Sequence, residues 1–292
     1  MMRFVLFSAV VVNSLDLFAT SIGIHWFGNR EGNPLLAPVI HQSWIAFVLG
    51  AIFGSAVTAL SWRLPRGESW VHGRSRCPAC GHVLGALDLV PILSWAFARG
   101  RCRYCRVPVS ARYPLIELSC AAWAVLVWAR LGLVPELAPV LLWGWLLVAL
   151  TVIDLDFKLL PDALTLPGTV LAVVAALLGP GAQHALIGMV VGSGYLWLFA
   201  WIWSTFLKRE GMGGGDIKLA AMFGALLGPL GAFLTITLAA FAGALAGALL
   251  MARGRGDMKS ELPFGTCLAP AAMAVFLWGD RAVQAYLALV RH

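Results

Sequence analysis

Charged residues are scarce in this chain of 292 residues, since they make up only 12% of it. A soluble globular domain has about 25% charged residues. Hydrophobic residues account for 60% of the chain, and its mean hydropathy is +0.85. A soluble fold of this length would have too little polar surface to stay dissolved. The composition therefore excludes a soluble globular protein and indicates one that resides in a lipid bilayer.

Long polar stretches are also few, and nine apolar runs approach the roughly 20 residues that a helix needs to cross the hydrocarbon of a bilayer. The runs cover residues 4–24, 43–62, 114–131, 138–157, 164–180, 184–207, 216–229, 231–252 and 266–289. Lipid cannot hydrogen-bond to an open backbone, so each run is expected to be helical. The sequence predicts an all-α polytopic membrane protein with eight or nine transmembrane helices.

The first residues lack a small-residue cleavage site of the A-x-A kind. Residues 1–40 are therefore expected to form an extra, retained transmembrane helix and an external loop. Asn13, Asp16 and Thr20 would share one face of this helix, where they either pack against other helices or serve a separate binding role. Residues 41–62 form the next predicted transmembrane helix.

Acidic residues are almost missing between residues 63 and 112, where only Glu68 and Asp88 oppose nine arginines. The nine are Arg63, Arg66, Arg74, Arg76, Arg99, Arg101, Arg103, Arg106 and Arg112. Such an excess between two spanning helices places a loop in the cytoplasm, next to anionic lipid headgroups. The net charge of +7 is thus explained by membrane topology, and no nucleic-acid partner is expected.

The same loop carries two C-x2-C pairs, Cys77–Cys80 and Cys102–Cys105. Two residues between cysteines let both thiolates face one centre, and two such knuckles complete a tetrahedral sulfur shell for Zn²⁺. Disulfides are disfavoured in the cytoplasm, and a redox pair would need a βαβ context that is missing here. We therefore predict that residues 63–112 are a cytoplasmic zinc-binding loop with a structural Zn²⁺.

Two clusters of acidic residues interrupt the apolar runs. The first contains Asp154, Asp156 and Asp162 around Lys158. Ionisable side chains at membrane depth are costly, so by default they indicate a functional site. Two carboxylates at one face of the membrane can share a proton and act as an acid/base pair in peptide hydrolysis.

The second cluster centres on Asp216, at the expected start of a helix where negative charge is favoured. Its neighbours are Glu210, Gly213, Gly215 and Lys218. Glycines before Asp216 allow a close approach of the backbone. Spacing alone does not decide which aspartate of the first cluster faces Asp216.

Two other readings of these acidic residues stay open. Asp162 could cap the next helix, and the group as a whole could form interfacial ion pairs with Lys158 and Lys218. A membrane transporter or channel with an aspartate-lined path and a zinc-regulated loop is a different functional class. Transport carboxylates lie near the midplane of the membrane, so the depth of the aspartates discriminates between the classes.

The motifs together resemble those of the type IV prepilin peptidase family, the leader peptidase/N-methyltransferases. The quoted segments are RCPACGH (76–82), PILSW (91–95), GRCRYC (100–105), SARYPLIE (110–117), DLDFKLLPDALTLP (154–167), EGMGGGDIKL (210–219) and LPFG (262–265). The likeness runs from about residue 47 to residue 280, and the order and spacing of the motifs carry it.

The resemblance implies an intramembrane aspartic endopeptidase in the bacterial inner membrane, with residues 113–292 as its core. It implies Asp154 and Asp216 as the catalytic pair and type IV prepilins or pseudopilins as substrates. Cleavage would follow their short basic leader at the cytoplasmic face. S-adenosylmethionine is implied as the methyl donor for the new N-terminus. Asp156, Asp162 and Glu210, the acids nearest the pair in sequence, are expected to receive the basic leader.

Overall fold

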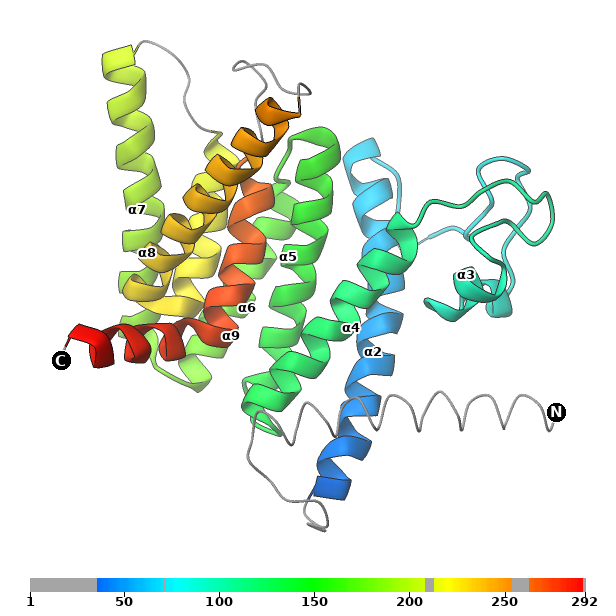
Figure 1. Cartoon of the computed structure of the whole chain (residues 1–292), viewed down its shortest axis with the longest axis horizontal. Coiled ribbons are helices and arrows are strands. Elements are labelled where there is room, and N and C mark those ends of the chain that lie inside the picture. Colours follow the sequence, from blue (N-terminus) through cyan, green and yellow to red (C-terminus); the bar gives the residue numbers. More distant parts are fainter. Residues whose placement is uncertain (1–35, 71, 208–212, 254–262, 291–292) are drawn as a thin grey trace.

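The protein is an all-α bundle, which confirms the predicted fold class (Figure 1). The computed structural model describes residues 36–70, 72–207, 213–253 and 263–290. Within these ranges there are no β-strands. Two isolated β-bridges join Arg76 to Val83 and Arg101 to Pro108. The predicted N-terminal helix at 4–24 and Glu210 lie outside the described residues.

Six of the described helices are long and apolar enough to cross a membrane. They are α2 (Leu36–Arg63), α4 (Arg112–Leu131), α5 (Leu137–Phe157), α7 (Ala182–Leu207), α8 (Gly214–Ala252) and α9 (Gly265–Val290). A shorter apolar helix, α6 (Asp162–Leu178), lies between α5 and α7 in the chain. The chain is thus a multi-pass membrane protein.

The predicted runs 216–229 and 231–252 are the two arms of α8. The chain reverses at Gly228, which has φ 69° and ψ −176°, and Pro229 follows it. Figure 1 shows the first arm descending and the second returning to the same end of the bundle. These dihedrals are essentially restricted to glycine. Any Cβ at Gly228 would also lie 2.2 Å from Cε1 of His184, so this position requires glycine.

Close helix packing holds the reversed α8 in place. A Cβ on Gly188 of α7 would lie 2.0 Å from the Gly224 carbonyl oxygen of α8, so the two backbones are in direct contact. Without a hydrophobic driving force inside lipid, helices associate through such small residues. The end of α5, the start of α8 and the start of α9 consequently meet at one end of the bundle (Figure 1).

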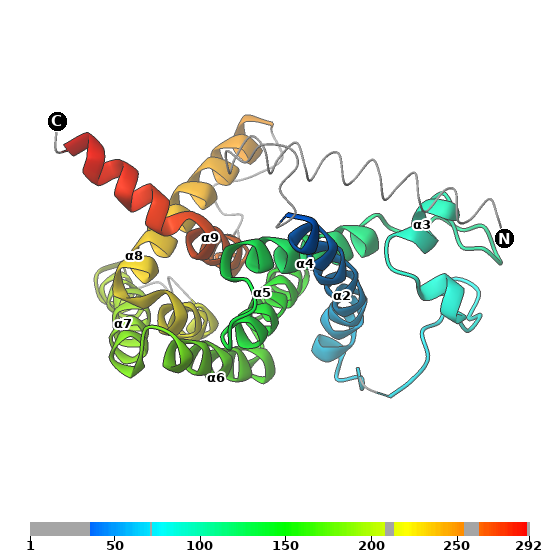
Figure 2. The same cartoon turned by 90° about the horizontal axis from the view of Figure 1, so that it is seen from below.

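The cysteine loop, residues 64–111, leaves α2 and α4 at that same end (Figure 1) and projects sideways from the bundle (Figure 2). It contains short helical turns, η1 (Leu64–Arg66), η2 (Ala86–Leu89) and α3 (Leu93–Phe97). Its polypeptide is mostly irregular, so something other than a ladder of backbone hydrogen bonds must hold it together.

Candidate active site and metal centre

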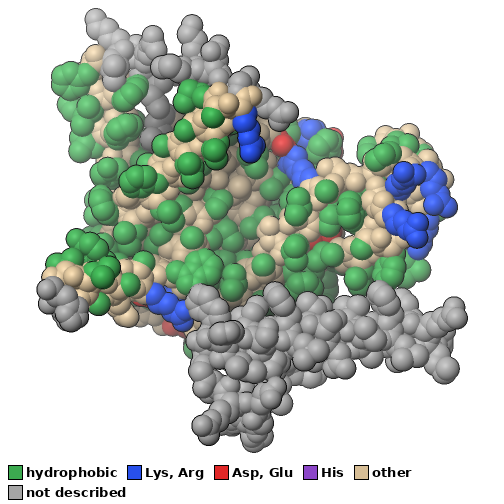
Figure 3. Space-filling view, in the orientation of Figure 1, with side chains coloured by type: hydrophobic (Ala, Val, Ile, Leu, Met, Phe, Trp, Pro, Cys, Tyr) green, Lys and Arg blue, Asp and Glu red, His purple; other side chains and the backbone are tan. Residues whose placement is uncertain are grey.

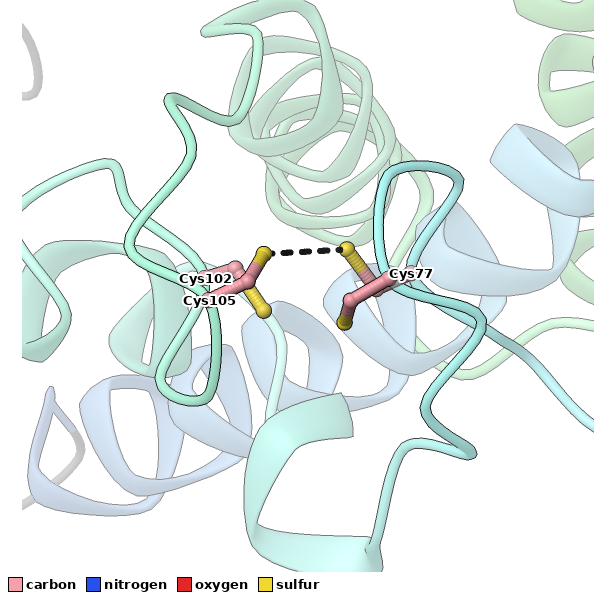
Figure 4. Close-up of side chains that lie close together, drawn as sticks. Cys77, Cys102 and Cys105 are labelled. Atoms are coloured by element: carbon pink, nitrogen blue, oxygen red, sulfur yellow. Dashed lines mark hydrogen bonds between the residues drawn. The ribbon is translucent and has the colours of Figure 1, made fainter.

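Four cysteine side chains meet in the centre of the cysteine loop. The sulfur atoms of Cys77, Cys80, Cys102 and Cys105 all lie within 4.8 Å of one another. Figure 4 shows the labelled thiols of the two knuckles pointing toward each other, and the Sγ atoms of Cys77 and Cys105 are 3.9 Å apart. Zn–S bonds of about 2.3 Å in a tetrahedron place sulfur atoms about 3.8 Å apart. The cluster therefore fits a tetrahedral metal ion.

The two knuckles share one backbone geometry. Gly81 N–H donates to the Cys77 carbonyl oxygen at 2.8 Å, and Arg106 N–H donates to the Cys102 carbonyl oxygen at 3.0 Å. Both donors have left-handed conformations, with φ of 71° at Gly81 and 63° at Arg106. This turn brings both cysteines of each knuckle to the same side. Backbone N–H groups of Cys80 and Ala79 lower the pKa of Cys77 to about 6, which favours the ligating thiolate.

Asp88 joins the two knuckles from the segment between them. Its carboxylate accepts hydrogen bonds from the Gly85 N–H at 3.0 Å and from the Tyr104 hydroxyl at 2.9 Å. Nη1 of Arg103 lies 3.3 Å from Oδ1 of Asp88. Desolvation opposes ionisation of Asp88, but these donors outweigh it and lower its pKa. Asp88, one of the two acidic residues among the nine arginines of this segment, is thus hydrogen-bonded and ion-paired within the loop itself.

Asp154 lies buried in the last turn of α5, only 5% exposed. Its Oδ2 atom has no hydrogen-bond partner in the described structure. A Cβ on Gly265, the first residue of α9, would lie 2.8 Å from that oxygen. The backbone N–H of the next residue, Thr266, faces the carboxyl group. The Asp154 carboxylate therefore occupies space that glycine leaves free at the start of α9.

Asp216 lies in the first turn of α8, close enough to Asp154 for the two charges to interact directly. Its N–H donates to the Gly213 carbonyl oxygen at 3.1 Å. Leu160 connects the two sides of the site. A Cβ on Gly215 would lie 2.9 Å from Cβ of Leu160, and a Cβ on Gly265 would lie 3.0 Å from its Cδ1. The starts of α8 and α9 thus pack on one leucine, which brings both carboxylates together.

The other two aspartates of the first cluster have partners of their own. Asp156 forms an ion pair with Arg112 of α4, on a different side of α5 from Asp154. Asp162 makes no capping hydrogen bond at the start of α6, where Pro161 is the N-cap residue. Its carboxylate instead accepts two hydrogen bonds from Nζ of Lys218, at 2.7 and 2.8 Å. Of these three aspartates, Asp154 is the buried one without an ion-pair partner in the described structure, and its neighbour Leu160 also packs against the start of the Asp216 helix.

Glu117 is a buried acid that the sequence reasoning did not single out. It lies in α4, is 9% exposed, and accepts a hydrogen bond from the Ile92 N–H of the cysteine loop at 2.7 Å. An ionisable residue in an apolar run was the signal available for finding it. Its partner could not be found that way, because the cysteine loop is irregular.

We expect Gly265→Ala to lower activity at this site strongly without preventing membrane insertion. The added methyl group would overlap Oδ2 of Asp154 and Cδ1 of Leu160 and would force the carboxylate to move. A misplacement of about 1 Å can cost about 100-fold in rate. Turnover of the substrate proposed below measures the loss. Gly243→Ala is the matched control, since its Cβ would meet Cys267 Sγ at an ordinary 3.7 Å. Equal activity of the two variants would contradict this geometry.

Comparisons with known proteins agree with the arrangement of the chain. Residues 48–131 match the bacterial peptidase A24 N-terminal domain, and residues 141–248 match the type IV leader peptidase family. No solved structure matches the chain.

Similar proteins bear the name prepilin leader peptidase/N-methyltransferase. The Aeromonas hydrophila protein is 42% identical over 216 residues, which are 73% of this chain and 74% of that protein. The Stutzerimonas stutzeri protein is 38% identical over 219 residues, 74% and 76% of the two chains. The Burkholderia pseudomallei (strain K96243) protein is 36% identical over 271 residues, 83% and 87% of the two chains. On these matches, which cover both the cysteine loop and the aspartate site, the chain belongs to the type IV leader peptidase family.

Proposed function

We propose that the chain removes the basic leader of type IV prepilins or pseudopilins by an aspartic mechanism that uses Asp154 and Asp216. One observation carries this proposal: the buried Asp154 carboxylate has an oxygen without a hydrogen-bond partner, beside the leucine, Leu160, on which the start of the Asp216 helix also packs. A buried carboxylate oxygen without a partner is costly, and such groups call for an explanation. A water molecule or a substrate carbonyl would supply the missing partner.

The chemistry needs one ionised and one protonated carboxyl group. Two like charges in contact cannot both ionise easily, so the pair shares one proton. The ionised member takes a proton from water as the water oxygen attacks the scissile carbonyl carbon, and the protonated member donates to the carbonyl oxygen. The C–N bond then breaks as the leaving amine takes one proton from the pair, and one hydroxyl of the tetrahedral intermediate returns its proton to the pair as the carbonyl re-forms. Peptide hydrolysis thus proceeds without a covalent intermediate.

We further propose a second activity, methylation of the new N-terminal amine. The names of the similar proteins support it. S-adenosylmethionine would supply the methyl group. The tetracysteine cluster would hold a structural Zn²⁺, because thiolates in a closed four-sulfur shell suit zinc and leave no open position for catalysis.

The depth of the aspartates supports cleavage at a membrane face. Asp154 lies in the last turn of α5, and Asp216 lies in the first turn of α8. Both are at the end of the bundle that carries the cysteine loop (Figure 1). With the arginine-rich loop in the cytoplasm, the site faces the cytoplasmic side of the bacterial inner membrane. A transporter would place its carboxylates near the midplane, so these positions favour the peptidase over that alternative.

We also propose that Asp156, Asp162 and Glu210 receive the basic leader. Arg112 and Lys218 already neutralise the first two. Lysines and arginines of a leader would therefore displace Arg112 and Lys218 from these carboxylates. The displacement costs little, because a surface ion pair contributes about 1 kcal/mol or less to stability.

Incubation of the purified protein with a prepilin, with and without S-adenosylmethionine, tests the proposed function. Mass spectrometry should show loss of the leader in both cases and addition of one methyl group only with the donor. Intact prepilin after prolonged incubation in lipid would overturn the peptidase proposal. Leader loss without methylation in the presence of the donor would overturn the second activity alone.

A further inference from the structure

The cysteine loop presents a patch of apolar side chains to its surroundings. Its members lie in η2, in α3 and between them, and we call Leu87, Leu89, Val90 and Leu93 the loop patch. Their exposed fractions are 72%, 41%, 36% and 47%. These four exposed apolar side chains lie within seven consecutive residues. Apolar side chains that gather on a surface mark an interaction site. This one lies next to a bundle of membrane helices.

A hydrogen bond fixes the depth of the loop patch relative to the bundle. The N–H of Ile92, between Val90 and Leu93, donates to Oε2 of Glu117 at 2.7 Å. Glu117 follows Arg112, the first residue of α4, by five residues, or about 7–8 Å along a helix axis. Figure 1 agrees, because α3 lies level with the first turns of α4 and below the adjacent ends of α2 and α5. The patch therefore lies level with the first turns of α4, a helix that is long and apolar enough to cross a membrane.

The hydrogen bond between Ile92 and Glu117 joins two residues that are each energetically unfavourable: Ile92 has an unusual backbone conformation, and Glu117 is a buried acid. Ile92 has φ 61°, a left-handed conformation that is an outlier for a β-branched residue. Glu117 is an acid on an apolar helix, which is expensive unless it is paired. Each cost is offset by the other group, since the twisted backbone aims its N–H at the carboxylate. We conclude that Glu117 holds this part of the loop against the bundle.

Exposed positive charge lies on and beside the second knuckle, and the ion pair between Arg103 and Asp88 connects this knuckle to η2. Arg99, Arg101, Arg103 and Arg106 are all exposed, and of these Arg103 pairs with Asp88. Figure 3 shows a dense group of Lys and Arg side chains on this part of the molecule, with hydrophobic side chains beside it. A basic residue next to an anionic bilayer contributes about 1 kcal/mol of attraction. Apolar side chains beside exposed arginines match the boundary between acyl chains and anionic headgroups.

We infer that the loop patch inserts into the interface of an anionic phospholipid bilayer, with Glu117 as the positioning residue that sets its depth. The arginines of the second knuckle contact the lipid phosphates. The cysteine loop is thus a membrane-bound element rather than a domain surrounded by water. This inference does not depend on the proposed peptidase activity.

Photo-crosslinking from the loop patch tests the inference. A benzophenone side chain replaces Leu87 or Leu93 in the full-length protein, reconstituted in nanodiscs of phosphatidylethanolamine and phosphatidylglycerol. Mass spectrometry should find phospholipid adducts at both positions and several-fold fewer at Glu68, an exposed control position elsewhere in the loop. Adduct yield should fall when phosphatidylcholine replaces the anionic lipid. Yields equal to that at Glu68, or adducts to a second protein in place of lipid, would overturn the inference.

Variants of Glu117 test its positioning role with the same readout. Glu117→Gln keeps a carbonyl oxygen for the Ile92 N–H, so lipid adducts at position 93 should persist. Glu117→Leu removes the acceptor and should reduce the adducts several-fold, while the zinc content stays unchanged because the cysteine cluster is separate. Equal adduct yields in Glu117→Leu and the unsubstituted protein would show that Glu117 does not set the depth.

Discussion

Asp154→Asn and Asp216→Asn should each lower leader removal by a factor on the order of 10²–10⁴, the usual contribution of a general acid or base. The reason is that an amide can neither accept a proton from water nor donate one to the scissile carbonyl. The side chains are nearly isosteric, so the variant proteins should insert and remain folded. Cleavage of a purified prepilin in proteoliposomes, followed by gel mobility and mass spectrometry, measures the effect.

Asp156→Asn is the matched control for this pair. Asp156 also lies at the end of α5, but its carboxylate pairs with Arg112 instead of facing Asp216. As one of three proposed leader-binding acids in a partly exposed ion pair worth about 1 kcal/mol or less, Asp156 should affect KM by no more than about fivefold, and its substitution should leave kcat unchanged. Near-normal cleavage by Asp154→Asn or Asp216→Asn, or a loss in Asp156→Asn as large as theirs, would refute the assignment of the pair.

Replacing Cys77 and Cys80 together with Ser should release the bound metal and loosen the cysteine loop. Neutral hydroxyls are poor substitutes for thiolates, and structural zinc contributes about 10–16 kcal/mol to folding in small zinc-binding peptides. The backbone hydrogen bonds of the loop lie within short turns, and among the described residues none joins one knuckle to the other. Elemental analysis should show one equivalent of zinc in the unsubstituted protein and none in the variant. Limited proteolysis should then cut within residues 64–111.

Cys267→Ser provides the control, because this free cysteine lies in α9, outside the cluster. Its zinc content and proteolytic pattern should match those of the unsubstituted protein. Another metal at one equivalent in protein purified under reducing conditions, or zinc retained by the Cys77→Ser, Cys80→Ser variant, would contradict a structural zinc site.

Local spacing predicted the parts of the site that depend on short segments of chain. Each C-x2-C pair forms a single turn, so the four cysteines could be assigned to one cluster before the structure was known. Residues two apart lie on different sides of a helix, and in the structure Asp156 pairs with Arg112 whereas Asp154 is buried beside Gly265. Such features follow from backbone geometry within a few residues.

Tertiary packing decided the remaining features, which spacing could not supply. The meeting of Asp154 with Asp216 depends on Leu160 packing against Gly215 and Gly265, residues that are far apart in the sequence. The partner of Glu117 depends on an unusual conformation at Ile92. The break in α8 was predicted, since residues 216–229 and 231–252 were separate apolar runs, but the contact of Gly228 with His184 that accompanies it depends on tertiary packing.

The pH dependence of kcat/KM for leader removal tests the central claim, that Asp154 and Asp216 act as one acid/base pair, most directly. At low pH both carboxyl groups are protonated and no base remains, whereas at high pH both are ionised and no acid remains. The account therefore predicts a bell-shaped profile that falls on both sides of a maximum and keeps its shape in Asp156→Asn. A profile with one limb only, or a plateau from acidic to basic pH, would contradict the shared-proton pair.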